Sequence, residues 1–468
     1  MPLQDQGASA PVVVVGAGIA GLAAARALAE AGEEVLLLEA SDHLGGKLRT
    51  SEVAGVRVDV GAEAMLNRRP EGVDLARAVG LALEHPTVAS SRIWTRGALR
   101  PLPRSLMGVP LDLAALEASG VLSEEGLERV RREPSLPPLD LAGADVSVGD
   151  LVAQRFGDEV VDRLVEPLLG GVYAGDARQL SARACIPQLV AFAERGSLLE
   201  QAAAIPTTYD VPVFAGIAGG MGSWPRRIVD DVSGLRVRTG VTVRELTRTP
   251  SGWRLVVGPT TAPEAIEARA VVLATPGAPT ARLLAEVAPA ASADLAGVEY
   301  SSMVVVTFAF DVSDVAGLDA TGSSGFLVPP TEARRIKAST FAFAKWGWIR
   351  RAGAAAGVAH LRTSLGRHGE ATALQASDDE LVAWSLADLA EATGLRARPV
   401  DVHVQRWGGG LPQYALGHLE TVARVRAALP EGLVVAGAAY DGVGIPAVIG
   451  SAQRAVADLL AHLRDLPR

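Results

Sequence analysis

Blocks of apolar residues at the start of the chain predict a strand–helix–strand unit. Residues 11–15 form a short β-branched run, which is typical of a buried strand. Residues 22–31 have high helix propensity and are followed by Gly32, a residue type common just after a helix end. Residues 35–39 form a second apolar run that ends in the acidic Glu39. This order of elements is typical of an α/β fold.

Glycines between the first strand and the helix give this unit a chemical interpretation. Gly16 allows a tight turn, Gly18 lets the backbone approach a pyrophosphate, and Gly21 lets the helix pack closely on the strand. The helix N-terminus then directs free N–H groups at the phosphates, and Glu39 accepts ribose hydroxyls. We therefore predict a dinucleotide site, against the alternative of an ordinary strand–helix–strand unit. Its residues are Gly16, Ala17, Gly18, Ile19, Ala20, Gly21, Glu39 and Ala40.

The rest of the chain divides into regions with different periodicities. Residues 111–204 are mostly helical by pattern, including a charged amphipathic stretch at 124–132 and helical spacing over 151–169. Strand-like alternation or apolar runs occur at 235–246, 253–257, 270–276, 304–310 and 340–344. A helix is predicted over 378–392, and residues 432–457 indicate a strand, a glycine turn and a helix starting at Ala447.

Composition excludes several classes of protein. The chain has 468 residues, of which 49% are hydrophobic and 21% charged, so global disorder is excluded, and a single cysteine excludes a disulfide scaffold. A net charge of −9 argues against nucleic acid as a partner, and the seven histidines show no metal-ligand spacing. The uncharged stretch 6–25 has the length of a membrane span, but its glycines belong to the dinucleotide motif. We expect no metal, no integral membrane segment, no signal peptide and a cytoplasmic location.

A second glycine pair follows the ribose-binding acid. Gly45-Gly46-Lys47 after Glu39 resembles the FAD-binding proteins of the amine oxidase and protoporphyrinogen oxidase superfamily. Members commonly carry arginine where this chain has Lys47; the alternative is a solvated loop lysine. Residues 59–64 resemble the family segment beneath the flavin ring. The resemblance implies FAD contacts at Gly46, Lys47, Arg49, Gly61, Ala62, Glu63, Ala64, Val243, Trp407, Gly437, Gly444, Ile445 and Pro446.

Three further strings narrow the resemblance to oxygen-dependent porphyrinogen oxidases. The string Tyr-Asp-Gly-Val-Gly-Ile-Pro at 440–446 lacks the second aromatic of the amine oxidase substrate cage. Residues 164–176 and 406–414 resemble other signatures of the same family, which place Gly171 near the tetrapyrrole and Trp407 beside the cofactor. The ending Gly444-Ile445-Pro446 resembles the Gram-positive coproporphyrinogen enzymes.

The implied reaction is FAD-dependent oxidation of coproporphyrinogen III to coproporphyrin III in haem biosynthesis, with dioxygen as acceptor and hydrogen peroxide released. The flavin takes hydride at N5, so no side chain is assigned as a catalytic base, and Glu63, Tyr173 and His418 are expected to be structural. Alternatives are a protoporphyrinogen IX oxidase, an FAD amine oxidase or desaturase, and a non-catalytic tetrapyrrole-binding flavoprotein. A transient contact with a ferrochelatase stays open.

Arginine is the candidate ligand for the substrate's propionates, because 41 of the 44 basic residues are arginine and only Lys47, Lys337 and Lys345 are lysine. A GC-rich genome is the simpler explanation of that excess. Residues 92–104 carry Arg92, Arg96, Arg100 and Arg104 on a predicted hairpin, with Arg92 and Trp94 on one face. The family's carboxylate-binding arginine falls at Arg92, against a solvated alternative. Lys337, Lys345 and Arg334 are weaker candidates, for which a solvated position is favoured.

Together these patterns predict an α/β protein whose FAD-binding domain is Rossmann-like and discontinuous, as is usual for the superfamily. We place this domain at residues 1–85, 205–285 and 405–468. A mixed α+β substrate-binding domain takes residues 86–110 and 286–404, and a helical subdomain takes residues 111–204.

Overall fold

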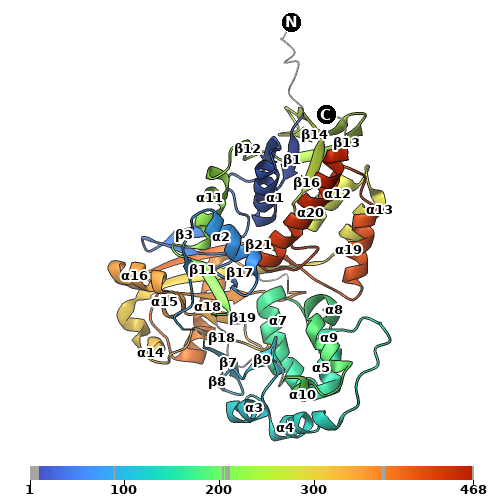
Figure 1. Ribbon diagram of the computed structural model, residues 1–468. Coiled ribbons are helices and arrows are strands. Elements are labelled where there is room, and N and C mark those ends of the chain that lie inside the picture. The colour runs from blue at the N-terminus through green and yellow to red at the C-terminus, as the bar shows by residue number, and fades with distance from the viewer. Residues whose placement is uncertain (1–9, 89, 203–204, 206–210, 371–374, 466–468) are drawn as a thin grey trace.

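The computed structural model describes residues 10–88, 90–202, 205, 211–370 and 375–465. These residues form three regions that meet near the middle of the molecule (Figure 1). One region contains a parallel sheet, the second a larger mixed sheet, and the third is helical. Among the described residues, no helix combines the length and the apolar composition that crossing a bilayer requires.

The parallel sheet draws its five strands from three distant parts of the chain. Its strand order is β12-β2-β1-β16-β22. The pairing of β1 with β2 and with β16 is parallel and in continuous register. The three central strands β2, β1 and β16 are buried on both faces, which explains why they are continuous apolar runs, whereas the edge strand β12 alternates apolar residues with arginine. The strands are β1 (Val12–Val15), β2 (Val35–Leu38), β12 (Leu235–Arg238), β16 (Ala270–Leu273) and β22 (Leu433–Val435).

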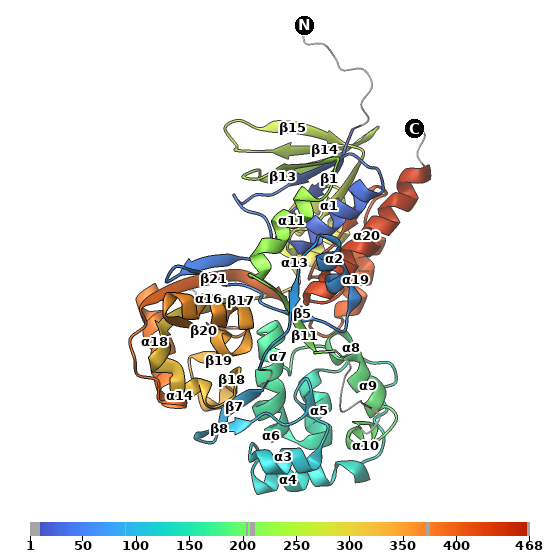
Figure 2. The same cartoon turned by 60° about the vertical axis from the view of Figure 1, so that its left-hand side comes forward.

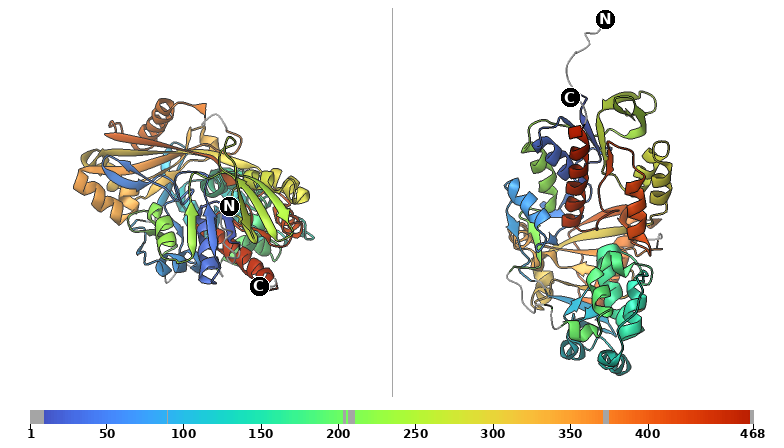
Figure 3. Two further views of the ribbon diagram at one scale, coloured as in Figure 1. Left: turned by 90° about the horizontal axis from the view of Figure 1, so that it is seen from above. Right: turned by 45° about the vertical axis from the view of Figure 1, so that its right-hand side comes forward.

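Helices and a small antiparallel sheet cover the two faces of this parallel sheet. On one face α1 and the long C-terminal α20 run side by side (Figure 3). On the other face lies the meander β13-β14-β15, seen at the top of Figure 2. The elements of this region are α1 (Ile19–Glu30), α2 (Pro70–Ala78), α11 (Trp224–Asp230), α12 (Gly277–Leu284), α13 (Pro289–Ala296), α19 (His418–Ala427), α20 (Ile445–Asp465), β3 (Thr50–Val53), β4 (Val56–Asp59), β5 (Met65–Leu66), β6 (Leu83–Glu84), β11 (Phe214–Ile217), β13 (Val243–Thr249), β14 (Gly252–Val257) and β15 (Glu264–Ala268).

The mixed sheet has seven strands in the order β21-β17-β20-β19-β18-β7-β8. Its two longest strands, β17 and β21, pair antiparallel and extend toward the parallel sheet (Figure 2). The predicted hairpin at residues 92–104 is present as β7 and β8. The elements are β7 (Ser91–Thr95), β8 (Ala98–Pro101), β17 (Tyr300–Asp311), β18 (Gly325–Leu327), β19 (Ile336–Thr340), β20 (Val358–Leu365), β21 (Asp401–Pro412), α14 (Ala316–Asp319), α15 (Ala342–Lys345), α16 (Gly347–Ala356) and α18 (Asp378–Thr393).

The third region is helical, as its periodicity predicts. Its own core is built from buried residues such as Leu151, Leu164 and Leu189. A π-helical turn at Val161–Val165 joins α6 to α7. The elements are α3 (Leu113–Ser119), α4 (Glu124–Arg131), α5 (Val148–Phe156), α6 (Asp158–Val160), α7 (Glu166–Tyr173), α8 (Ala182–Cys185), α9 (Pro187–Ala193), α10 (Leu198–Ala202), β9 (Ser105–Leu106) and β10 (Val109–Pro110).

The predicted α/β fold class with its mixed and helical additions is confirmed, but three predicted elements differ. The strand-like run at 235–246 is two strands, β12 and β13, which lie in different sheets. The strand predicted at 340–344 is wrong: β19 ends at Thr340 and the turn α15 follows. The pairing of β19 with β18 ends at Thr340 and Gly325, where β18 begins, and Lys345 at the end of α15 pairs with Glu63 instead of continuing the strand. The C-terminal helix begins at Ile445 rather than Ala447, because Pro446 is well suited to a first helical turn.

Candidate functional site

The turn between β1 and α1 is close-packed. Gly16 has φ +98°, and a Cβ on Gly21 would lie 1.8 Å from the Gly16 carbonyl oxygen. The helix has Gly18 at its N-cap and no side chain bonded to its first amides. Those amides are therefore available to an anion, which the helix dipole also favours.

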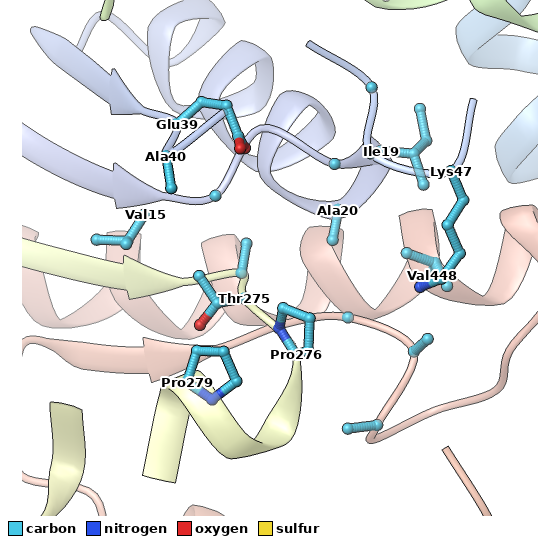
Figure 4. A pocket seen from close by; sticks show the side chains of 18 of the residues that line it. Val15, Ile19, Ala20, Glu39, Ala40, Lys47, Thr275, Pro276, Pro279 and Val448 are labelled. Carbon is cyan, nitrogen blue, oxygen red and sulfur yellow. The ribbon is translucent and has the colours of Figure 1, made fainter. Parts of the chain in front are cut away.

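A cavity of about 730 Å³ opens in front of this helix end, at the carboxyl ends of β1, β2 and β16 (Figure 4). Its size is that of a pocket for a sizeable organic ligand. Of the residues predicted to contact the cofactor, twelve line it: Gly16, Gly18, Ile19, Ala20, Glu39, Ala40, Gly46, Lys47, Ala62, Val243, Gly437 and Ile445.

Glu39 stands at the end of β2 with its carboxylate fixed by the backbone. One carboxylate oxygen accepts a hydrogen bond from the Ala17 N–H at 2.7 Å. The other accepts from the Ser41 N–H and the Ser41 hydroxyl, both at 2.9 Å. The carboxylate is thus held at the cavity wall beside the glycine turn, with lone pairs left for hydroxyl donors.

The glycine pair at 45–46 places Lys47 in the cavity. The Gly45 N–H donates to the Ala17 carbonyl at 2.7 Å, which ties this loop to the first glycine turn. The Lys47 side chain extends into the cavity and ends near Val448 of α20 (Figure 4). The surrounding protein desolvates its ammonium and lowers the pKa of Lys47 from its usual range. Lys47 is exposed, and because it lines the cavity its ammonium is available to a ligand bound there.

Residues 59–64 contribute one cavity-lining side chain, Ala62, whose N–H donates to the Lys47 carbonyl at 3.0 Å. A Cβ on Gly61 would lie 2.1 Å from that same carbonyl oxygen, so a larger residue does not fit. The Trp407 indole N–H donates to the Val60 carbonyl at 3.2 Å. Trp407 therefore supports this segment from behind and does not itself line the cavity.

Glu63 points away from the cavity into a buried cluster of charges. It pairs with Lys345 at 2.6 Å and with Arg362 at 3.1 Å. Burial alone would raise the pKa of Glu63, but the charges of Arg362 and Lys345 outweigh it and lower the pKa to about 2. Burial raises the pKa of the neighbouring Asp59 to about 7.

The turn before α20 closes one end of the cavity. Gly437, Ala438 and Ile445 line it. The N-terminus of α20 therefore faces the cavity. Asp441 in this turn is paired with both Arg426 and Arg454, which fixes the turn from its outer side.

The structure does not bring every predicted residue to the cavity wall. The remaining predicted cofactor residues lie next to the wall or behind it, and their contacts stay predictions: Ala17, Gly21, Arg49, Gly61, Glu63, Ala64, Trp407, Gly444 and Pro446. Sequence reasoning missed a wall formed by the turn between β16 and α12 and by the ends of β17 and β21. Its residues include Thr275, Pro276, Pro279, Arg282, Tyr300, Leu411 and Pro412. The Thr-Pro-Gly turn after a buried parallel strand was a usable signal for the first part of this wall.

The two predicted substrate residues lie outside this cavity. Arg92 is half-buried on β7, and its guanidinium donates to the Thr321 carbonyl at 3.4 Å. Gly171 is exposed on α7, and a Cβ there would meet nothing within 4 Å. Their roles therefore stay predictions.

The lysines expected to be solvated are not. Lys345 is bound to Glu63, and Lys337 is buried with no hydrogen-bond partner for its Nζ. Arg334 is ion-paired with Glu391. Tyr173 and His418 both pack against Tyr414, the latter stacked at 3.9 Å between ring centroids. Within the described ranges, no group of three or more His, Cys, Asp or Glu side chains is arranged to hold a metal.

Comparison with known proteins agrees with this geometry. Residues 19–460 match the family model described as flavin containing amine oxidoreductase. A Mycobacterium tuberculosis protein named coproporphyrinogen III oxidase is 38% identical over 96% of this chain and 97% of its own length. A Bacillus subtilis protein of the same name is 29% identical, over 97% and 98%.

A solved structure of a related protein has the same fold. The crystal structure of an Exiguobacterium protein named as a protoporphyrinogen oxidase superposes with a TM-score of 0.85 at 30% identity. The alignment covers 98% of this chain and 100% of that one. The family model spans most of the chain, from the glycine turn to α20. The chain therefore belongs to the flavin containing amine oxidoreductase family and is an oxidoreductase.

Proposed function

We propose that the protein oxidises coproporphyrinogen III to coproporphyrin III with FAD as its cofactor and dioxygen as the electron acceptor, releasing hydrogen peroxide. The observation that carries the redox chemistry is the dinucleotide-sized cavity between the uncapped end of α1 and the turn before α20. The substrate comes from the name of the Mycobacterium and Bacillus relatives, which match this chain over nearly its whole length.

The residues of the cavity fit FAD. The first-turn amides of α1 suit the pyrophosphate, and the fixed carboxylate of Glu39 suits the ribose hydroxyls. Lys47 and the N-terminus of α20 place positive charge at the far end, where it favours a reduced anionic flavin. When bound, the flavin supplies the hydride acceptor for a bridge carbon of the porphyrinogen.

The remaining task of the chain is to bind and orient the substrate. A tetracarboxylate approaching a protein of net charge −9 needs a local positive site. Arg92 is suited to this task, because its guanidinium donates to a neutral carbonyl and so keeps its charge for an incoming carboxylate. Gly171 leaves open space on α7 for the tetrapyrrole. No side chain is assigned as a base; the pyrrole N–H proton leaves to solvent.

A protoporphyrinogen IX oxidase is the second candidate. It is favoured by the name of the Exiguobacterium structure, which superposes on nearly the whole chain. The two substrates differ in carboxylate number, so they make different demands on the arginines around the substrate.

Turnover with identified products tests the proposal. The purified protein is incubated aerobically with coproporphyrinogen III, and porphyrin fluorescence and hydrogen peroxide are measured together. We expect coproporphyrin III with three peroxides per porphyrin, and release of FAD rather than FMN on denaturation. Absence of flavin, or of enzyme-dependent porphyrin formation, would contradict the proposal.

A further inference from the structure

An arginine of the seven-stranded sheet holds the segment that carries the cavity-lining Ala62. Arg362 lies on β20, and its Nη1 donates to the Gly61 carbonyl at 2.9 Å. Its Nη2 pairs with a Glu63 carboxylate oxygen at 3.1 Å. One guanidinium therefore holds the chain immediately before and immediately after Ala62, the residue of this segment that lines the cavity.

The same segment is tied to the cofactor loop on its other side. The Ala62 N–H donates to the Lys47 carbonyl, and Gly61 packs against that carbonyl so tightly that no Cβ fits. Because Lys47 extends into the cavity, a shift of Gly61 or Ala62 moves the backbone that carries this ammonium. Arg362 thus does not line the cavity itself. It holds the Gly61 carbonyl, and the next residue, Ala62, holds the Lys47 carbonyl through its N–H.

The charges around Arg362 are buried and closely balanced. Glu63 is 8% exposed, and the side chains of Arg362 and Lys345 are 17% and 20% exposed. Asp59 is the other acid near Arg362. Loss of Arg362 removes one positive charge from this cluster and leaves the Gly61 carbonyl without this donor, and both changes cost more in a buried site than at the surface.

We propose that Arg362 is a positioning residue for the flavin: it fixes residues 61–63 and, through them, Lys47 at the cavity wall. This inference rests on the proposed FAD site. It assigns a cofactor role to a residue on the mixed sheet, on a strand that does not contribute to the cavity wall.

Matched variants measured on the purified holoprotein test the inference. Arg362→Gln removes the charge and the two-pronged contact, whereas Arg362→Lys keeps the charge. Arg350→Gln is the control, because Arg350 forms an exposed bidentate pair with Asp319 on the same region and touches neither the cavity nor residues 59–64. The readouts are the FAD dissociation constant and the flavin midpoint potential, both obtained without any porphyrinogen.

We expect Arg362→Gln to bind FAD about tenfold more weakly or worse, since a charge-assisted contact is lost. The substitution should weaken the binding of reduced FAD more than the binding of oxidised FAD. Each tenfold difference between these two losses of affinity lowers the midpoint potential by about 30 mV. Arg362→Lys should recover the potential more fully than the affinity, and Arg350→Gln should match the wild type. If Arg362→Gln does not fold, Arg362→Lys replaces it: the lysine keeps the charge but cannot hold the Gly61 carbonyl and Glu63 with two separate nitrogens, so FAD should still bind more weakly.

Wild-type FAD affinity and potential in Arg362→Gln, or wild-type FAD affinity in Arg362→Lys where that variant replaces it, would overturn the inference alone. A wild-type protein that carries no FAD would overturn the proposed function together with it. The two failures are therefore distinguishable.

Discussion

The Tyr414 hydroxyl joins the end of β21 to the turn that precedes α20: it accepts a hydrogen bond from the Gly442 N–H at 2.8 Å. The same hydroxyl donates to the Ala438 carbonyl at 2.6 Å. Ala438 lines the cofactor cavity, and Gly442 has φ +130°, a conformation that favours glycine. The Tyr414 hydroxyl therefore bonds to the backbone near both the start and the end of this turn.

Tyr414→Phe should loosen this turn and weaken FAD binding. The Ala438 carbonyl and the Gly442 N–H each lose a buried partner, which costs about 1–3 kcal/mol, or roughly a 5- to 150-fold change in dissociation constant. Fluorescence titration of released and rebound FAD measures the effect. Ser119→Ala is the control, because it deletes a buried hydroxyl that donates to the Leu116 carbonyl and accepts from the Val121 N–H, and none of these residues lines the cavity. Equal affinities in both variants would contradict the role of Tyr414.

The two glycines Gly21 and Gly18 should respond oppositely to alanine. In Gly21→Ala the new Cβ meets the Gly16 carbonyl at 1.8 Å, and backbone cannot move aside cheaply, so we expect a loss of about 3 kcal/mol or failure to fold. In Gly18→Ala the Cβ meets no protein atom within 4 Å, so the fold should persist. That Cβ enters space assigned to the pyrophosphate, and FAD affinity should fall by about tenfold or more. Circular dichroism with FAD titration separates the outcomes; an unfolded Gly18→Ala would contradict the assignment.

Lys337 should make stability depend on pH. Burial, and secondarily the charge of Arg367, lowers the pKa of Lys337 from 10.5 to about 7. Between these values the unfolded chain binds the proton and the folded chain does not, so the destabilisation is largest below pH 7 and fades as pH rises toward 10.5. Lys337→Met should therefore stabilise the protein by about 1–3 kcal/mol at pH 6 and by less at pH 9.

Thermal unfolding of Lys337→Met and wild type at the two pH values measures this difference. A gain that is the same at pH 6 and pH 9 would show that packing, and not the charge, explains the effect. A loss of stability at pH 6 would show that the amine has a partner.

Arg92→Ala should raise KM for coproporphyrinogen III about five- to twentyfold, because one charge-assisted hydrogen bond to a carboxylate is lost. Bound FAD should not change, since Arg92 lies outside the cofactor cavity. Arg96→Ala is the matched control: this arginine is exposed at the tip of the same hairpin. Unchanged kinetics in Arg92→Ala would remove Arg92 from the substrate site.

The parts of the site that sequence predicts well are those fixed by local geometry. Gly16, Gly21 and Glu39 fall within one strand–helix–strand unit, where backbone spacing alone determines which residues meet. The predicted start of α20, Ala447, is only two residues later than the observed start, Ile445, because a glycine turn and Pro446 mark this helix end in the sequence.

The parts that sequence does not predict depend on pairing between distant segments. Glu63 and Arg362 are 299 residues apart, and β7 finds its parallel partner in β18, far along the chain. Residues 340–344 alternate like a strand, yet β19 ends at Thr340 and residues 342–345 form the one-turn helix α15, in which Ala342 packs into a core cluster and Lys345 pairs with Glu63. In each case the deciding contact is tertiary, so local pattern cannot supply it.

Anaerobic mixing of the FAD-loaded protein with each porphyrinogen, followed through the flavin absorbance, tests the central claim most directly. We expect fast bleaching of the oxidised flavin by coproporphyrinogen III and little or none by protoporphyrinogen IX. Fast reduction by protoporphyrinogen IX alone would reverse the substrate assignment, and reduction by neither would contradict the proposed activity.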